Sequence, residues 1–192
     1  MDGKFALSLE PEVAAEEGLK VEQALPDERI REIAAANDIR RCYNAAAHFL
    51  SYRPRSEPEV RQRLKKRGFK PASIDTVMEK LKRQRLVDDT AFARFWTENR
   101  QSFSPRSKRL TRLELKQKGI AEDIIEEVVA TINDEETACL AAQKKMRSLK
   151  DADYQTFRRR MGDYLRRRGF GYEVIGSVIN RVWQEKETEY NS

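Results

Sequence analysis

A motif that recurs three times along the 192-residue chain constrains its fold more than any other feature. Each copy reads leucine, a basic residue, any residue, a basic residue, glycine and an apolar residue, at 64–69, 115–120 and 165–170. The glycines lie 51 and 50 residues apart, and each is followed six residues later by isoleucine. A period near 50 residues, with apolar positions in phase, indicates stacked supersecondary units.

The apolar spacing within one period predicts three helices. In the first unit, apolar residues at helical spacing predict a helix over about 38–52. A second helix should begin at Ser56, with Glu59 completing a capping box, and should end at Gly68 in the left-handed conformation. Pro71 suits the first position of a third helix, which should run to about residue 85.

The second and third units repeat this order, and no segment shows the alternation typical of a strand. We expect helices from Asp89, from Ser104-Pro105 to Gly119, over 122–132, over Asp134–Leu149, from Asp153 to Gly169, and over 173–184. The predicted fold is therefore all-α, with three tandem three-helix repeats stacked into an elongated, curved array. The predicted boundaries are an acidic arm over 1–37, repeats over 38–87, 88–133 and 134–187, and a tail over 188–192.

The charge distribution separates the arm from the repeats. Residues 1–38 carry ten acidic and four basic side chains, a formal charge of −6, whereas the whole chain is +6. We expect the arm to be mobile and partly disordered, apart from a short helix over 28–36, because it is acidic and poor in aromatic residues. Residues 39–192 carry a formal charge of +12, which favours a polyanionic partner.

The excess of basic residues recurs on the second helix of each repeat. Segments 53–85, 94–118 and 144–168 have formal charges of +8, +6 and +7. One cation in a helix's last turn would satisfy its macrodipole, so the surplus favours a polyanion or an acidic surface over simple solvation. Base reading by the third helix is disfavoured, because 119–132 has four acidic and no basic residues.

The sequence gives no support for an enzyme, a metal site or a membrane protein. His48 has no ligand partner nearby, and no phosphate-binding glycine motif is present. We expect Cys42 and Cys139 to fill core space. No apolar run could span a membrane, and the acidic N-terminus lacks a secretory signal. Five acidic residues could be imagined as a metal site, but a solvated helix face explains them better: Glu122, Glu126, Glu127, Asp134 and Glu135. Five aromatic residues could stack on bases, but their helical spacing favours core packing: Phe92, Phe95, Trp96, Phe103 and Trp183.

Three stretches resemble the RecX regulatory proteins of bacteria. They are RPRSEPEVRQRLKKRGF at 53–69, LVDDTAFARFW at 86–96 with LKQKGI at 115–120, and LRRRGFGYEVI at 165–175. The resemblance covers about residues 38–187 and leaves out the acidic arm. It implies tandem three-helix repeats in an elongated, curved body, and a role in modulating the RecA recombinase, usually by inhibition. It also implies binding in the groove of the RecA filament on single-stranded DNA.

The resemblance and the basic bands together predict a non-catalytic, cytoplasmic regulator that needs no cofactor or metal and acts as a monomer. Its partners would be the RecA filament and single- or double-stranded DNA, through phosphate contacts. A general DNA-binding repeat module and a scaffold for an acidic protein remain as alternatives. The residues predicted to contact the partner are Arg61, Lys65, Lys66, Arg67, Arg109, Arg112, Lys116, Lys118, Arg158, Arg159, Arg166, Arg167 and Arg168.

Overall fold

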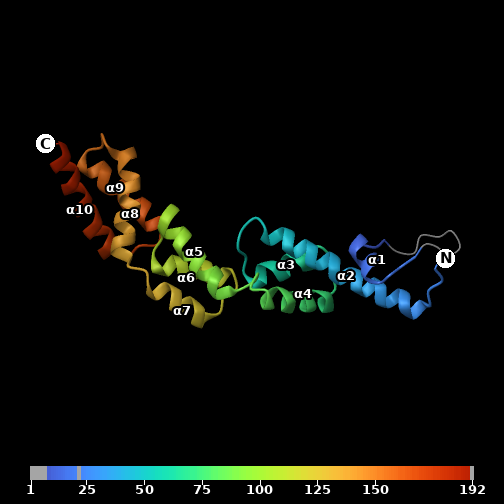
Figure 1. The fold of residues 1–192 in the computed structure, drawn as a ribbon. Coiled ribbons are helices and arrows are strands. Elements are labelled where there is room, and N and C mark those ends of the chain that lie inside the picture. Colours follow the sequence, from blue (N-terminus) through green and yellow to red (C-terminus); the bar gives the residue numbers. More distant parts are fainter. Residues whose placement is uncertain (1–7, 21–22, 191–192) are drawn as a thin grey trace. The chain divides into compact units, whose positions relative to one another are not determined.

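The computed structural model describes residues 8–20 and 23–190, and within these ranges it contains helices and no strand (Figure 1). The all-α prediction is therefore confirmed. The helices are α1 (Pro11–Glu16), α2 (Asp27–Leu50), α3 (Glu57–Lys66), α4 (Pro71–Arg83), α5 (Asp89–Phe103), α6 (Lys108–Gln117), α7 (Glu122–Ala130), α8 (Asp134–Met146), the 3₁₀ helix η1 (Arg147–Leu149), α9 (Tyr154–Arg167) and α10 (Tyr172–Tyr190).

The chain divides into two compact units. Unit 1 ends at Asp88 and holds the first repeat, in which α2, α3 and α4 pack on one another. Unit 2 begins at Asp89 and holds the other two repeats, formed by α5–α7 and α8–α10. The predicted three-helix organisation is thus present three times.

The repeated glycines end the second helices as predicted. Gly68, Gly119 and Gly169 have φ angles of 84°, 76° and 88°, in the left-handed region that favours glycine. After α3, the Gly68 N–H donates to the Lys65 carbonyl at 3.0 Å and the Phe69 N–H donates to the Leu64 carbonyl at 3.3 Å. These bonds satisfy carbonyls at the end of the helix.

The predicted starts of the second helices are confirmed in the first and third repeats. In the second repeat, Ser107 rather than Ser104-Pro105 marks the start, because its side chain accepts from the Leu110 N–H and caps α6. Ser56 and Glu59 form the capping box, and the Asp153 carboxylate accepts from two backbone N–H groups of α9. The third repeat differs at its first helix. Asn133, rather than Asp134, is the N-cap residue, and the α-helix stops at Met146 before a 3₁₀ turn.

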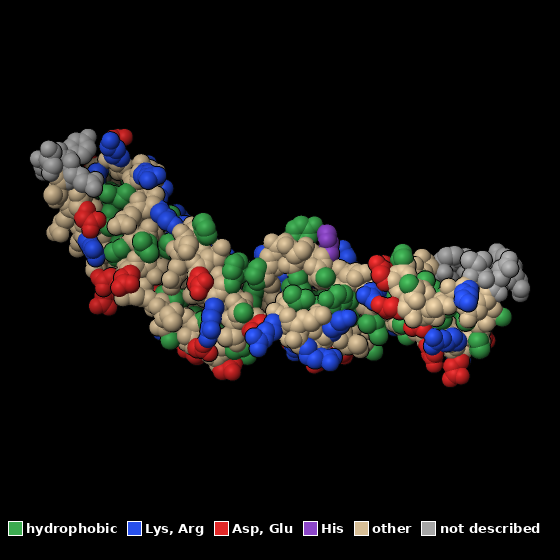
Figure 2. Space-filling model, in the orientation of Figure 1, with side chains coloured by type: hydrophobic (Ala, Val, Ile, Leu, Met, Phe, Trp, Pro, Cys, Tyr) green, Lys and Arg blue, Asp and Glu red, His purple; other side chains and the backbone are tan. Residues whose placement is uncertain are grey.

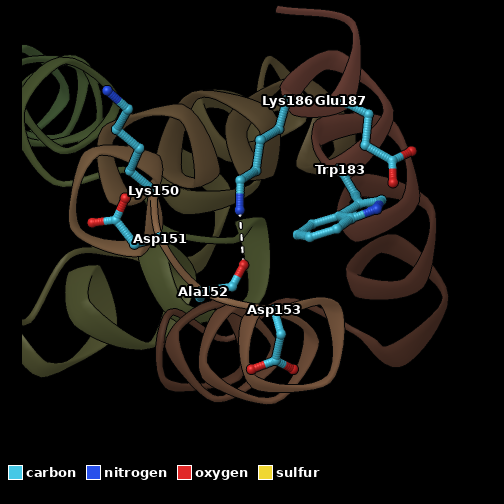
Figure 3. A pocket seen from close by; sticks show the side chains of 7 residues that line it. All are labelled: Lys150, Asp151, Ala152, Asp153, Trp183, Lys186 and Glu187. Carbon is cyan, nitrogen blue, oxygen red and sulfur yellow. Dashed lines mark hydrogen bonds between the residues drawn. The ribbon is translucent and has the colours of Figure 1, made fainter. Parts of the chain in front are cut away.

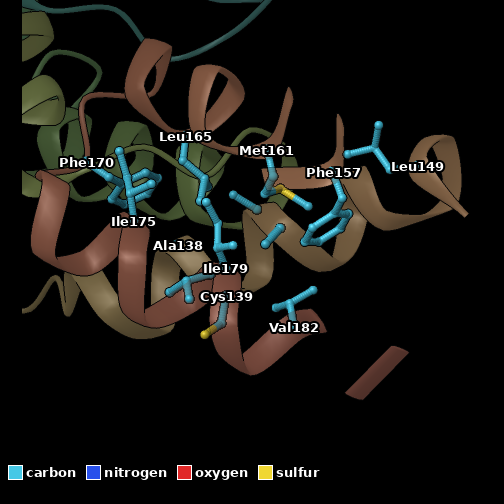
Figure 4. Close-up of a cluster of buried hydrophobic side chains, with 13 residues drawn as sticks. Ala138, Cys139, Leu149, Phe157, Met161, Leu165, Phe170, Ile175, Ile179 and Val182 are labelled. Carbon is cyan, nitrogen blue, oxygen red and sulfur yellow. The ribbon is translucent and has the colours of Figure 1, made fainter. Parts of the chain in front are cut away.

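Each repeat has its own hydrophobic core. In unit 1, α2 places Cys42 and Ala46 against apolar residues of α3 and α4. In the third repeat, Phe157, Met161 and Leu165 of α9 face apolar residues of α8 and α10 (Figure 4). Cys42 and Cys139 are buried, so the prediction that they fill core space is confirmed.

The structure corrects the predicted start of the first helix. Helix α2 begins at Asp27 rather than near residue 38, and it therefore absorbs the short helix expected within the arm. The two predicted helices run on as one, since no proline or glycine interrupts residues 27–50, and Asp27 and Glu28 suit the first turn. The side chain of buried Asn37 accepts from the Glu10 N–H at 2.8 Å and donates to the Ser8 carbonyl at 2.9 Å. Those bonds attach the described residues before α1 to the middle of α2. Residues 1–7 and 21–22 of the predicted arm lie outside the described ranges.

The second and third repeats touch where α9 ends. The Ser107 N–H donates to the Arg168 carbonyl at 3.0 Å, and a Cβ built on Gly169 would lie 2.6 Å from Ser107 Oγ. Glycine is therefore required at 169 for close approach as well as for its φ angle. This contact joins the start of α6 to the end of α9 within unit 2.

Candidate functional site

The basic residues at the end of α3 form an exposed group in unit 1. Lys65, Lys66 and Arg67 are all exposed, and none of them has an ion-pair partner among residues 8–20 and 23–190. Arg109 of α6 and Arg158, Arg159 and Arg167 of α9 share both properties in unit 2. These seven predicted residues are available to a partner.

Two other predicted residues are engaged within their own repeats. Arg61 donates to Glu57 at 2.7 Å and to Asp75 of α4 at 2.6 Å. Arg112 pairs with Glu126 of α7 at 2.5 Å. Arg61 and Arg112 occupy equivalent positions, seven residues before Gly68 and Gly119. The same ion pair therefore links the second and third helices in the first two repeats. Its role is internal, which the sequence prediction missed.

In the third repeat, glycines occupy both positions of this ion pair. Gly162 and Gly176 lie seven residues before and after Gly169. A Cβ on Gly162 would be 3.7 Å from Ile179 Cδ1, so α9 and α10 approach closely there. The third repeat thus joins these helices by packing rather than by charge.

The acidic residues of α7 serve mainly as internal partners. Glu126 pairs with Arg112, Glu127 with Arg94 at 2.6 Å, and Glu122 lies 3.8 Å from Lys116. Acidic and basic side chains accordingly lie side by side over this part of unit 2 (Figure 2). The described residues contain no cluster of His, Cys, Asp or Glu that could hold a metal ion.

A buried carboxylate in unit 2 gathers cations that the sequence prediction left out. Glu114 is 8% exposed, and its carboxylate accepts from Trp96 Nε1 at 2.9 Å and from Arg100 Nε at 2.8 Å. It also accepts from Arg106 Nη1. Burial lowers the pKa of both guanidinium groups, and Arg100 and Arg168 lower that of Arg106 further.

Aromatic rings lie beside several cations in this part of unit 2. Arg100 and Lys118 lie 4.5 and 4.9 Å from the centre of the Trp96 ring. Arg168 lies 3.9 Å from the centre of the Tyr164 ring. We call Arg100, Arg106 and Arg168 the unit 2 arginine cluster. Lys118 and Arg168 were predicted contacts, and the structure places both beside aromatic rings.

Unit 1 contains a second group of arginines near a carboxylate and an aromatic ring. Arg55 lies 4.1 Å and Arg63 lies 5.6 Å from the centre of the Phe49 ring, and Arg53 pairs with Glu59 at 3.1 Å. We call Arg53, Arg55 and Arg63 the unit 1 arginine cluster. A signal for both clusters exists in the sequence, because Pro-Arg-Ser occurs at 54–56 and again 51 residues later at 105–107.

The remaining predicted cation, Arg166, pairs with Asp163 at 2.6 Å on the surface of α9. An exposed i,i+3 pair of this kind is weak, so Arg166 can exchange it for another anion.

The aromatic residues of α5 are only partly buried, which corrects the prediction that all of them belong to the core. Phe92 is 1% exposed and Trp96 packs beside it, but Phe95 and Phe103 are 36% and 78% exposed. Phe95 points away from the face defined by Phe92, Ala93 and Thr97, and Phe103 is the last residue of the helix. Trp183 does cover core residues, with its ring centre 5.1 Å from that of Phe157.

An open pocket lies beside Trp183 in the third repeat. Its volume is about 730 Å³, and its lining includes Lys186, Glu187 and Asp153 (Figure 3). Lys186 is already engaged, since its Nζ donates to the Ala152 carbonyl at 2.9 Å. His48 is exposed on α2 and contacts Tyr52. No helix in the described ranges is both long and apolar enough to span a membrane.

Comparison with known proteins identifies the family. Models described as the first, second and third three-helix domains of RecX match residues 42–81, 88–129 and 133–179. The chain belongs to the RecX family. This confirms the resemblance drawn from the three motif stretches, and the matches fall on the three repeats of the structure.

Individual RecX proteins are similar over most of the chain. A relative from Geobacillus kaustophilus, "Regulatory protein RecX", is 31% identical over 90% of this chain and 65% of its own length. One from Clostridium botulinum with the same name is 29% identical over 95% of this chain and 87% of its own. The crystal structure of RecX from Lactobacillus salivarius has a TM-score of 0.62 and 26% identity, covering 76% of this chain and 97% of that one. The chain therefore spans slightly under two thirds of the Geobacillus relative.

Proposed function

We propose that this chain regulates the RecA recombinase by binding its filament on single-stranded DNA and suppressing ATP hydrolysis, strand exchange and co-protease activity. Membership of the RecX family carries this proposal, because its relatives are named as regulatory proteins. It would act in the cytoplasm as a monomer, without a cofactor or catalytic residues.

The charged surfaces of both units support a partner that exposes phosphates. Exposed basic residues without an ion-pair partner in the described part of the chain end α3 and occur along α6 and α9, where they can contact an anionic backbone. A filament on DNA presents such a backbone together with protein, so it could use these residues and the exposed aromatic side chains, such as Phe103, at once.

The direct test is the DNA-dependent ATPase rate of RecA. With RecA assembled on single-stranded DNA, adding this protein at increasing concentration should lower the rate of ATP hydrolysis until it saturates. A rate that stays unchanged at saturating protein would rule the proposal out. A matched sample in which Lys65, Lys66 and Arg67 are changed to glutamate should inhibit less, because three cations available to the partner are lost.

A general DNA-binding module is the second candidate, favoured by the same exposed cations. It predicts binding to DNA alone that weakens with salt, with a log–log slope of about −0.7 for each phosphate contacted on a single strand. Inhibition of RecA without measurable binding to DNA alone would exclude it. A scaffold for an acidic protein would instead bind neither DNA nor the filament.

A further inference from the structure

Both arginine clusters hold more positive charge than their carboxylates neutralise. In unit 2, the buried carboxylate of Glu114 accepts from two guanidinium groups, those of Arg100 and Arg106, and the charge of a third, Arg168, acts on Arg106. In unit 1, Glu59 pairs with Arg53, and Arg55 lies among the charges of Arg53 and Arg63. Each cluster therefore keeps net positive charge in a partly buried place.

The clusters also retain unused hydrogen-bond donors. Arg55 Nε and Arg168 Nε are buried, and neither has a hydrogen-bond partner within the described part of the chain. A buried donor without an acceptor is costly, and more so when it carries charge. Burial lowers the pKa of Arg55, and the neighbouring Arg53 and Arg63 lower it further. A bound anion would relieve both costs.

One arginine recurs at the same repeat position in two separately packed units. Arg55 and Arg106 each stand between a proline and the serine that caps the second helix, and both serines are fully buried. Holding one carboxylate in place requires one cation, so the internal role leaves the additional arginines unexplained. Arg55 and Arg106 each lie 13 residues before their glycine, and their recurrence indicates a function served once in each unit.

We propose that each arginine cluster is a discrete binding site for one phosphate group of a nucleic acid strand. The guanidinium fork matches two oxygens of a phosphodiester, and several forks can share one group. The choice of nucleic acid rests on the proposed function, and the recurrence at a fixed repeat position suits a polymer with regularly spaced phosphates.

Charge-conserving substitutions separate discrete sites from a diffuse basic surface. Arg55→Lys and Arg106→Lys keep the charge but remove the fork, so each should weaken binding of a short single-stranded oligothymidylate about tenfold at fixed salt. Arg41→Lys and Arg160→Lys are matched controls on exposed arginines outside both clusters, and their affinity should change less than about twofold. Wild-type affinity in both cluster variants would overturn the proposal.

Trp96 provides a second readout that does not depend on DNA. It touches Arg100 and donates to Glu114, so occupation of the unit 2 cluster should change its fluorescence. In a Trp183→Phe background, inorganic phosphate should produce a saturable change that chloride at equal ionic strength does not. Glu114→Gln should shift this titration to lower phosphate concentration, since the competing carboxylate charge is removed. No saturable response in the folded protein would overturn the unit 2 site, even if Arg106→Lys proved unstable.

An acidic competitor distinguishes phosphate from protein carboxylate. If polyglutamate competes with oligothymidylate as strongly at equal charge, and with the same dependence on Arg55 and Arg106, the sites serve acidic proteins and the nucleic-acid assignment is wrong. If it competes weakly, the assignment is supported. None of these assays contains RecA, so their failure is distinguishable from failure of the ATPase test.

Discussion

Replacing Gly169 with alanine should destabilise unit 2 more than the equivalent change destabilises unit 1. Gly169 and Gly68 end α9 and α3 with nearly the same φ, 88° and 84°. They differ in their surroundings. A Cβ on Gly169 would lie 2.6 Å from Ser107 Oγ and 2.8 Å from Leu110 Cβ, whereas a Cβ on Gly68 would meet nothing within 4 Å.

The geometry separates two contributions to the loss of unfolding free energy. The left-handed conformation costs an L residue about 1–2 kcal/mol, and this applies to both variants. At 169, the start of α6 must also move by about 0.6–0.8 Å to reach ordinary contact distance, and overpacking of this kind costs about 1–3 kcal/mol more. We therefore expect the free energy of unfolding to fall by about 1–2 kcal/mol for Gly68→Ala and by about 2–5 kcal/mol for Gly169→Ala.

Urea unfolding followed by tryptophan fluorescence measures unit 2, because Trp96 and Trp183 both lie there. Circular dichroism follows unit 1 as well. Gly176→Ala is a control in the same unit, since Gly176 is inside α10 with open space around it. Gly176→Ala should raise the free energy of unfolding of unit 2 by about 0.5–1 kcal/mol. If Gly169→Ala costs no more than Gly68→Ala, the close contact between the second and third repeats is not as described.

Three further predictions concern single features of unit 1. A double-mutant cycle with Arg61→Ala and Asp75→Ala should give a coupling of about 0.2–1 kcal/mol in the free energy of unfolding, because the ion pair is partly exposed. A coupling of zero would contradict the internal role of this pair. Burial raises the pKa of Cys42 to about 11, so its alkylation should be slow at pH 8 and should accelerate with pH or with urea; rapid labelling of the native protein would contradict this. Arg85→Gly should raise the unfolding free energy by about 0.5–1 kcal/mol in urea titration, because Arg85 has a φ of 55°, in the left-handed region that favours glycine. A decrease would show that the Arg85 side chain stabilises the helix end.

The pH dependence of unit 1 follows from the same thiol. A raised folded-state pKa means that the folded protein disfavours the thiolate. The free energy of unfolding should therefore fall as pH rises above about 8.5, the usual value for a free thiol, toward 11.

The repeats could be predicted from the sequence because their signals are local. Ser56, Glu59 and Gly68 form a cap or a turn with residues next to them in the chain, and apolar spacing defines each buried face. The attachment of residues 8–10 to α2 could not be predicted in this way. It uses Asn37, which bonds to residues 27 and 29 positions away in the sequence.

The contact residues were harder to predict, because charge counts do not reveal pairing. Arg61 and Arg112 look like surplus cations in the sequence, yet acidic residues of the next helix neutralise them. The unit 2 arginine cluster combines residues of α5, the loop before α6 and the end of α9. Only the packing of the second repeat on the third brings these positions together.

Binding to the assembled filament tests the central claim most directly. The labelled protein should be titrated, at one salt concentration, against RecA on single-stranded DNA, against the same DNA alone, and against RecA alone. The account predicts at least about tenfold tighter binding to the filament than to either component, because protein and phosphate contacts act together on one surface. Equal affinity for the filament and for bare DNA would contradict it and leave a general DNA-binding module.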